Sequence, residues 1–287
     1  MSNAVNADSP VAVVGAGTMG AGIAHAFLTA GNTVEVREVS AAAAAAGRER
    51  IVRMVRQSFD RGRLEEPMDE VLGRLSVTEG LDRLGHAGLI IEAVPEIPSL
   101  KHETWRTISD SAHGDAILAS NTSSIAISSI ARNAALPGRL LGMHFFNPVP
   151  SSQLVEVVRC ENTEDHAVDA ALLFVRSLGK EPIVVRDSPG FASSRLGVAV
   201  GLEAVRMLEE GVASAEDIDR AMVLGYRFPV GPLRLTDLVG LDVRLGIADY
   251  LAAELGERFT APALMRTMVD QGHLGRKSGR GFFDWTS

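Results

Sequence analysis

The sequence predicts an α/β domain built on a mainly parallel sheet, followed by a second, all-helical domain. Through the first two thirds of the 287 residues, short runs rich in Val, Ile and Leu alternate with helical patterns, as strands and helices do in α/β folds. The runs are continuously apolar, which is typical of strands whose two faces are both covered. After the turn cluster DSPG at 187–190 no further strand pattern is found, so a domain boundary is expected there.

Seven strands are expected in the first domain, which we place at residues 1–187. Their ranges are 11–14, 33–36, 89–91, 116–119, 140–144, 154–158 and 182–185. Amphipathic periodicity predicts helices at 18–30, 41–59, 100–112 and 166–178. The region near 41–72 is expected to form an inserted helical hairpin, and its alanine run starts a helix because alanine has the highest helix propensity.

The second domain, residues 188–287, is expected to contain helices only. Their ranges are 191–210, 215–224, 241–255 and 262–271. Gly211, the PVGP at 229–232 and Gly256 separate them. The acids of DLVGLD at 237–242 are interpreted as helix caps and turns.

Composition and charge exclude several kinds of function. The chain is 46% hydrophobic and 22% charged, as in soluble globular proteins. Its net charge of −8, from 28 basic and 36 acidic residues, argues against a general nucleic-acid-binding protein. The single cysteine, Cys160, cannot form an intrachain disulfide and fits a reducing, cytoplasmic compartment. We expect no secretory signal and no metal ion. We also expect no membrane span, since no apolar run reaches roughly 18 to 20 residues.

A glycine motif, GAGTMG, directly follows the first strand and opens a helix, as in Rossmann-type dinucleotide-binding domains. Gly15 permits the tight turn, Gly17 lets the backbone approach a pyrophosphate, and Gly20 lets helix and strand pack closely. The second strand ends near Glu38, which can accept both adenosine ribose hydroxyls and so favours NAD. Arg37 lies beside Glu38 and could serve NADP, so the choice of cofactor stays open. The alternative interpretation of the whole motif is a structural glycine turn with a solvated glutamate.

His144 and Glu156 lie on neighbouring predicted strands, joined by a loop with two prolines. A histidine can take the proton of a hydroxyl group while hydride leaves the carbon. A carboxylate on the other ring nitrogen would fix the tautomer and stabilise the imidazolium. The alternative is a structural buried ion pair.

Two further strand ends carry polar residues, SNTSS at 120–124 and EAVPE at 92–96. Ligands of open α/β sheets bind at the carboxyl ends of strands. One residue of SNTSS is expected to cap the next helix, but five small polar residues exceed the needs of one cap.

Several motifs occur in an order that resembles the L-3-hydroxyacyl-CoA dehydrogenases, most closely the short bacterial 3-hydroxybutyryl-CoA dehydrogenase type. They are GAGTMGAGIA (15–24), EAVPE (92–96), SNTSS (120–124), HFFNPVP (144–150), LVEVV (154–158), DSPGF (187–191) and GRKSGRGFF (275–283). The resemblance covers nearly the whole chain. It implies a two-domain enzyme with NAD as cofactor.

The resemblance also implies roles for individual residues. His144 matches the catalytic base, Glu156 the carboxylate that orients it, and Ser123 a serine that touches both the substrate oxygen and the nicotinamide ribose. Arg61 matches a basic contact to the phosphates of CoA. The implied cofactor contacts, besides the glycines and Glu38, are Thr18, Met19, Glu96, Lys101, Ser123, Asn147 and Lys277.

One position departs from the family pattern P-G-F-x-x-N-R. The chain reads PGFASSR at 189–195, so Ser194 replaces the asparagine expected near the substrate carbonyl. Because a serine offers one donor and an amide two, we expect Ser194 to contact the substrate differently and to alter the preferred acyl chain.

Six arginines lie within residues 48–63 of this acidic chain. Arg50, Arg53 and Arg56 recur every three residues and share a helix face. Together with Arg61 they could bind the phosphates of CoA, and a solvated face is the alternative.

The predicted function is therefore the reversible, NAD-dependent oxidation of an (S)-3-hydroxyacyl-CoA. The substrate is 3-hydroxybutyryl-CoA or another short or dicarboxylic acyl-CoA. Two alternatives remain: a dehydrogenase of a free hydroxy acid of the gulonate or carnitine type, and a non-catalytic dinucleotide-binding protein. The high apolar content of the C-terminal helices, with the resemblance, predicts a homodimer formed through that domain.

Overall fold

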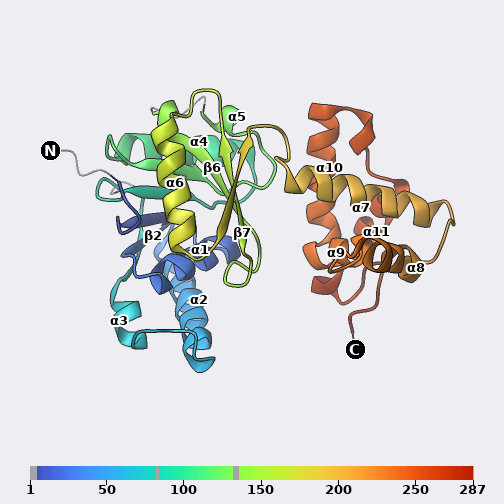
Figure 1. The fold of residues 1–287 in the computed structure, drawn as a ribbon, viewed down its shortest axis with the longest axis horizontal. Coiled ribbons are helices and arrows are strands. Elements are labelled where there is room, and N and C mark those ends of the chain that lie inside the picture. Colours follow the sequence, from blue (N-terminus) through green and yellow to red (C-terminus); the bar gives the residue numbers. More distant parts are fainter. Residues whose placement is uncertain (1–4, 82–83, 132–135, 287) are drawn as a thin grey trace. The chain divides into compact units, whose positions relative to one another are not determined.

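The computed structural model describes residues 5–81, 84–131 and 136–286 of the chain. The chain divides into two compact units, Met1–Ser188 and Pro189–Ser287 (Figure 1). The first is a mainly parallel sheet with helices on it, and the described part of the second contains helices but no strand. The predicted fold class is confirmed.

The sheet of the first unit has eight strands in the order β3-β2-β1-β4-β5-β6-β7-β8. Their bounds are β1 Val11–Val14, β2 Val34–Glu38, β3 Leu75–Glu79, β4 Leu89–Glu92, β5 Ile117–Ser120, β6 Leu140–Phe145, β7 Leu154–Arg159 and β8 Glu181–Arg186. All neighbouring strands are parallel except β6 and β7, which are antiparallel. The order 3-2-1-4-5-6 of the first six strands is that of a dinucleotide-binding sheet, with its switch point between β1 and β4.

Strand β3 is the element of the sheet that the sequence prediction missed. It lies at the edge of the sheet beside β2, and only Leu75 of its five residues is buried. The continuous apolar run that marks the central strands is therefore absent. Two helices, α2 (Ala41–Asp60) and α3 (Met68–Gly73), lie between β2 and β3 in the chain.

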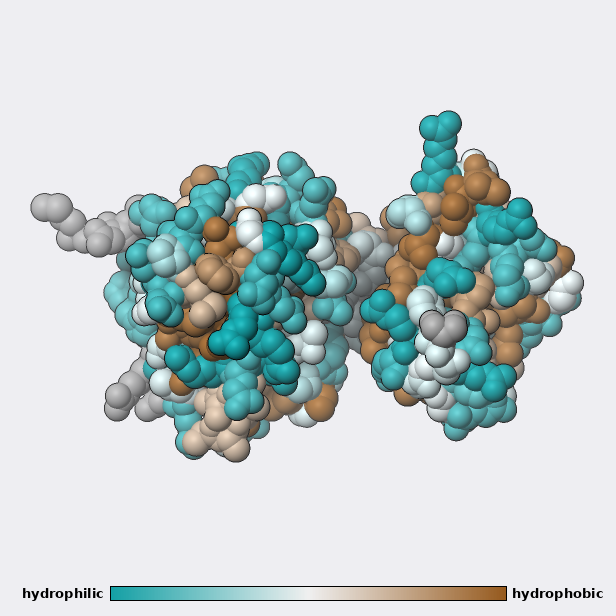
Figure 2. Space-filling view, turned by 90° about the horizontal axis from the view of Figure 1, so that it is seen from below, coloured by the Kyte–Doolittle hydropathy of each residue, from teal (hydrophilic) through white to brown (hydrophobic). Residues whose placement is uncertain are grey.

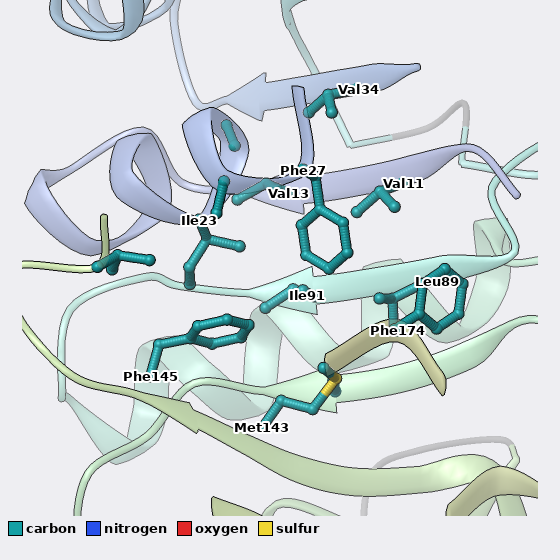
Figure 3. Packing of buried hydrophobic residues seen from close by; sticks show 14 of the residues in the cluster. Val11, Val13, Ile23, Phe27, Val34, Leu89, Ile91, Met143, Phe145 and Phe174 are labelled. Carbon is teal, nitrogen blue, oxygen red and sulfur yellow. The ribbon is translucent and has the colours of Figure 1, made fainter. Parts of the chain in front are cut away.

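The main hydrophobic core lies between the sheet and the helices α1 (Thr18–Thr29) and α6 (Asp165–Ser177). In Figure 3, Ile23 and Phe27 of α1 point toward Ile91 of β4. The rings of Phe27 and Phe174 meet edge to face, with centroids 6.1 Å apart. Helices α4 (Pro98–Ser111) and α5 (Ile127–Ala131) follow β4 and β5 and bury their own apolar residues.

His25 of α1 is buried against α2, where its Nε2 lies 2.8 Å from the Ser58 hydroxyl. Burial, with a smaller contribution from the charge of Lys180, lowers the pKa of His25 to about 4. The unfolded chain binds this proton near pH 6.5, so the folded chain loses stability as pH falls from 6.5 toward 4.

We therefore expect the free energy of unfolding of the wild-type chain to fall by about 2 kcal/mol more between pH 7 and pH 5 than that of His25→Gln. Urea titrations at the two pH values measure this difference. His113→Gln, at an exposed histidine, serves as the control and should behave like the wild type. An equal change in the free energy of unfolding with pH in the wild type and in His25→Gln would contradict the lowered pKa of His25.

The second unit contains five α-helices in its described part. They are α7 Ser193–Glu209, α8 Ala215–Arg220, α9 Pro232–Val239, α10 Leu241–Leu255 and α11 Ala263–Asp270. Helix α9 was not predicted, because the PVGP was interpreted as a break. Pro232 is instead the first residue of that helix, a position where proline costs no hydrogen bond.

Asp242 lies in the first turn of α10, in keeping with the interpretation of DLVGLD as caps and turns, but that interpretation was wrong for Asp237. Its buried carboxylate accepts hydrogen bonds from the backbone of Phe282 and Phe283 and from the indole of Trp285. It thereby fastens the C-terminal segment to α9.

Candidate active site

The carboxyl ends of β1, β4, β5 and β6 lie side by side at one edge of the sheet, because these strands are parallel neighbours. The glycine loop follows β1, the segment 92–96 follows β4, and the segment 120–124 follows β5. His144 is the penultimate residue of β6. The fold thus brings together the four polar segments that the sequence singled out.

His144 and Glu156 are directly opposite each other in the antiparallel β6–β7 pair. Nδ1 of His144 lies 2.7 Å from the Glu156 carboxylate. The imidazole is 4% exposed and Glu156 is fully buried, so the carboxylate holds the ring in one orientation. The ring also lies against Phe146, with centroids 4.4 Å apart.

Ser123 lies in a loop that the Glu96 carboxylate holds together. One oxygen of Glu96 accepts three hydrogen bonds. The donors are the Thr122 hydroxyl, the backbone N–H of Ser123 at 3.0 Å, and the backbone N–H of Ser124. Burial alone would raise the pKa of Glu96, but the Lys101 charge and these hydrogen bonds hold it below its usual value. Glu96 therefore stays ionised and fixes Ser123, whose side chain is partly exposed.

Lys101, a predicted cofactor contact, is 1% exposed and lies between two carboxylates. Its Nζ is 2.7 Å from Glu92 and 3.3 Å from Glu96. Glu92, the first carboxylate of the EAVPE segment that the sequence singled out, also accepts hydrogen bonds from Trp105 and Ser120. This buried cluster fixes the ends of β4 and β5 relative to α4.

The loop after His144 is anchored at two points. Asn121 accepts a hydrogen bond from the backbone N–H of Phe145 at 2.9 Å, which ties the Ser123 loop to β6. The buried ammonium of Lys180, another residue that sequence reasoning missed, donates to the carbonyls of Val149 and Ser152 at 2.7 and 2.5 Å. Asn147, a predicted cofactor contact, is exposed on this loop.

The glycine loop has the geometry of a pyrophosphate cradle. A Cβ on Gly20 would lie 1.8 Å from the Gly15 carbonyl oxygen, whereas a Cβ on Gly17 would meet no atom within 4 Å. Close packing therefore requires glycine at position 20, and open space lies beside Gly17. Thr18 and Met19 form the first turn of α1, whose N-terminal N–H groups suit a phosphate.

Glu38 accepts a hydrogen bond from the backbone N–H of Ala16 at 2.6 Å, so its carboxylate lies beside the glycine loop. Arg37, which left NADP open, is buried and pairs with Glu35 at 2.5 Å. The residues present thus fit a dinucleotide whose ribose hydroxyls face a carboxylate.

Four of the predicted arginines, three in α2 and Arg61 directly after it, divide into two groups. Arg50 donates to the Ala16 carbonyl and so supports the glycine loop. Arg53, Arg56 and Arg61 are exposed. A pocket of about 150 Å³ at the end of α2 is lined by His25, Ala26, Thr29, Ser58, Arg63, Pro150, Leu178 and Lys180.

Two predicted site residues belong to the second unit. Ser194 is partly buried in the first turn of α7. Lys277 pairs with Asp242, with Nζ 2.6 Å from the carboxylate.

In the described part of the chain, no helix is long and apolar enough to cross a membrane.

The sequence of this chain matches two family models that together span nearly all of it. The 3-hydroxyacyl-CoA dehydrogenase NAD-binding domain matches residues 10–188, and the C-terminal domain of the same enzymes matches residues 190–285. The chain belongs to the 3-hydroxyacyl-CoA dehydrogenase family. It is an NAD-dependent dehydrogenase.

Other members of the family match over almost their full length. A 3-hydroxybutyryl-CoA dehydrogenase from Mycobacterium tuberculosis is 44% identical over 96% of this chain and 98% of that protein. The mitochondrial hydroxyacyl-coenzyme A dehydrogenase of Rattus norvegicus is 37% identical over 96% and 90% of the two chains. The crystal structure of (S)-3-hydroxybutyryl-CoA dehydrogenase PaaH1 from Ralstonia eutropha has a TM-score of 0.91 at 38% identity, covering 97% and 99%.

Proposed function

We propose that the chain catalyses the reversible oxidation of short (S)-3-hydroxyacyl-CoA thioesters to 3-oxoacyl-CoA with NAD. The observation that carries this proposal is the His144–Glu156 pair, 2.7 Å apart at the sheet edge to which the glycine loop also belongs. A dinucleotide-binding protein without turnover has no need of a base held in this way. The relatives named 3-hydroxybutyryl-CoA dehydrogenases support a short acyl chain.

In the oxidising direction, Nε2 of His144 takes the proton of the substrate 3-hydroxyl as the carbinol carbon becomes a carbonyl carbon. Bound NAD would supply the acceptor for the hydride that leaves that carbon. Glu156 accepts the Nδ1–H of the ring, which selects the tautomer with a basic Nε2 and stabilises the imidazolium that forms. Ser123 donates a hydrogen bond to the substrate oxygen. In the reducing direction His144 returns the proton.

The choice of NAD over NADP rests on Glu38 and Arg37. A carboxylate beside the glycine loop would repel a 2′-phosphate. The guanidinium that could have attracted this phosphate is buried against Glu35. Glu96, Lys101, Asn147 and Lys277 are further proposed contacts or supports of the cofactor.

We propose that Arg53, Arg56 and Arg61 bind the phosphates of CoA, which favours a CoA thioester over a free hydroxy acid. Replacing all three by Ala is expected to raise the KM for acetoacetyl-CoA by about 10-fold. The rate with acetoacetyl-N-acetylcysteamine, a thioester without phosphates, should stay within twofold of wild type. Steady-state kinetics with both substrates provide the comparison. An unchanged KM for the CoA substrate would reject this landing site and favour the free-acid alternative.

We also propose a cytoplasmic homodimer formed through the C-terminal helical domain. The free thiol of Cys160 is buried, which suits a reducing compartment. Figure 2 shows apolar side chains at the surface of the second unit, where Leu196, Leu224 and Tyr226 are exposed. Such residues commonly become buried in an interface between subunits.

A further inference from the structure

Helix α2 packs directly against the glycine loop. A Cβ on Gly47 of this helix would collide with the Cβ of Ala16 in the loop. Arg50 follows Gly47 by three residues, so the two lie on the same face of α2. The guanidinium of Arg50 donates a hydrogen bond to the Ala16 carbonyl. The close packing at Gly47 therefore holds the charge of Arg50 at the middle of the glycine loop.

The side chains around Ala16 leave this end of the loop suited to an anion. The Ala16 N–H donates to the Glu38 carboxylate at 2.6 Å, and the Ala16 carbonyl accepts from Arg50. An uncovered carbonyl oxygen at this place would repel a phosphate, and a guanidinium bonded to it offsets that repulsion. Helix α1 has no side-chain cap and no acidic residue in its first turn, so its first N–H groups also favour an anion.

Arg50 still has donors to offer to such an anion. Within the described residues, its one hydrogen bond is that to the glycine loop, and no carboxylate pairs with it. The side chain is partly exposed, and a guanidinium carries five N–H donors. Two other cations of this part of the sheet are engaged elsewhere, since Arg37 pairs with Glu35 and Lys101 with Glu92. The charge of Arg50 is therefore the one placed to balance an anion at the loop.

We propose that Arg50 is a further cofactor-binding residue, whose guanidinium pairs with the pyrophosphate of NAD. The inference rests on the NAD site of the proposed function and adds a residue to it. The pyrophosphate brings two negative charges to a loop that Glu38 already borders, and a planar guanidinium matches phosphate oxygens through parallel hydrogen bonds. The phosphates of CoA are a poorer assignment, because Arg50 is bonded to the glycine loop whereas Arg53 and Arg56 are exposed.

The test measures the dissociation constant (Kd) for NADH by fluorescence titration. Arg50→Met keeps the apolar stem of the side chain without its charge and should raise this Kd by about 10-fold or more. Arg50→Lys keeps the charge and should stay within about threefold of the wild type. Arg48→Met, at an exposed arginine of the same helix, is the matched control and should bind NADH like the wild type.

A second measurement locates the contact by competition of AMP and ADP with bound NADH. ADP contains the diphosphate of NAD, whereas AMP carries only the phosphate next to the adenosine. We expect the wild type to bind ADP about 10-fold more tightly than AMP, and Arg50→Met to lose most of this preference. Arg50→Gln, which is also neutral, repeats both measurements if urea unfolding shows that Arg50→Met does not fold.

The possible results separate this inference from the proposed function. An unchanged Kd for NADH in the neutral variants would overturn the role of Arg50, and a raised KM for acetoacetyl-CoA alone would assign it to CoA instead. Weaker NADH binding with an unchanged preference for ADP would show that Arg50 only supports the loop, and would also overturn the contact. If the wild type binds NADH through Arg50 but reduces no 3-oxoacyl-CoA, the proposed function falls and the contact stands.

Discussion

The His144→Gln variant is expected to reduce acetoacetyl-CoA about 1000-fold more slowly than the wild type, with the loss in kcat. Glutamine keeps a polar side chain of similar size but cannot exchange a proton with the substrate oxygen. In the wild type, Nδ1 of His144 lies 2.7 Å from a fully buried carboxylate, which holds the ring as a base. Steady-state and single-turnover rates of NADH oxidation measure this loss of kcat.

The matched control for this variant is His166→Gln. His166 also lies beside a glutamate, Glu164, at 3.1 Å, but both side chains are largely exposed. This variant should keep the wild-type kcat, and His144→Gln should bind NADH with unchanged affinity in a fluorescence titration. A His144→Gln enzyme with more than a tenth of wild-type kcat would remove His144 from the catalytic role.

Gly20→Ala is expected to destabilise the first unit by about 3 kcal/mol or more and to abolish NADH binding. The added Cβ would lie 1.8 Å from the Gly15 carbonyl oxygen. Because that contact is with backbone, only a movement of the whole loop or of α1 can relieve it. Urea unfolding followed by circular dichroism gives the stability, and NADH fluorescence gives the binding.

Gly17→Ala separates the effect on binding from the effect on folding. Its Cβ would meet no protein atom within 4 Å, so the free energy of unfolding should change by less than about 1 kcal/mol. The affinity for NADH should still fall, by about 10-fold or more, since the methyl group occupies the space beside the proposed pyrophosphate position. NADH binding as tight as in the wild type would show that the cofactor does not approach Gly17.

The central strands and most helices could be predicted from the sequence because their physical signals are local. A strand buried on both faces, such as β4, is a continuous apolar run, and a helix such as α6 shows its apolar face at regular spacing. The edge strand β3 gives neither signal, since four of its five residues keep some exposure. Helix α9 begins at a proline, which at sequence level cannot be told from a break.

The candidate site was predictable where a residue contrasts with its own surroundings. Glu156 stands inside an apolar strand and His144 at the end of another, and their direct pairing follows from the antiparallel turn between them. Lys180 gives no such contrast, because its partners are backbone carbonyls of another segment of the chain. Glu92 was singled out as a carboxylate at a strand end, but its buried partners Lys101, Trp105 and Ser120 come from other elements and could not be predicted.

The most direct test of the proposed function is NADH oxidation by the wild-type chain with acetoacetyl-CoA as the only other reactant. We predict a loss of NADH absorbance that depends on both compounds, with (S)-3-hydroxybutyryl-CoA as the product. Tight binding of NADH with no turnover of acetoacetyl-CoA, 3-oxohexanoyl-CoA or 3-oxoadipyl-CoA would contradict the proposal and leave the free-acid dehydrogenase as the first alternative.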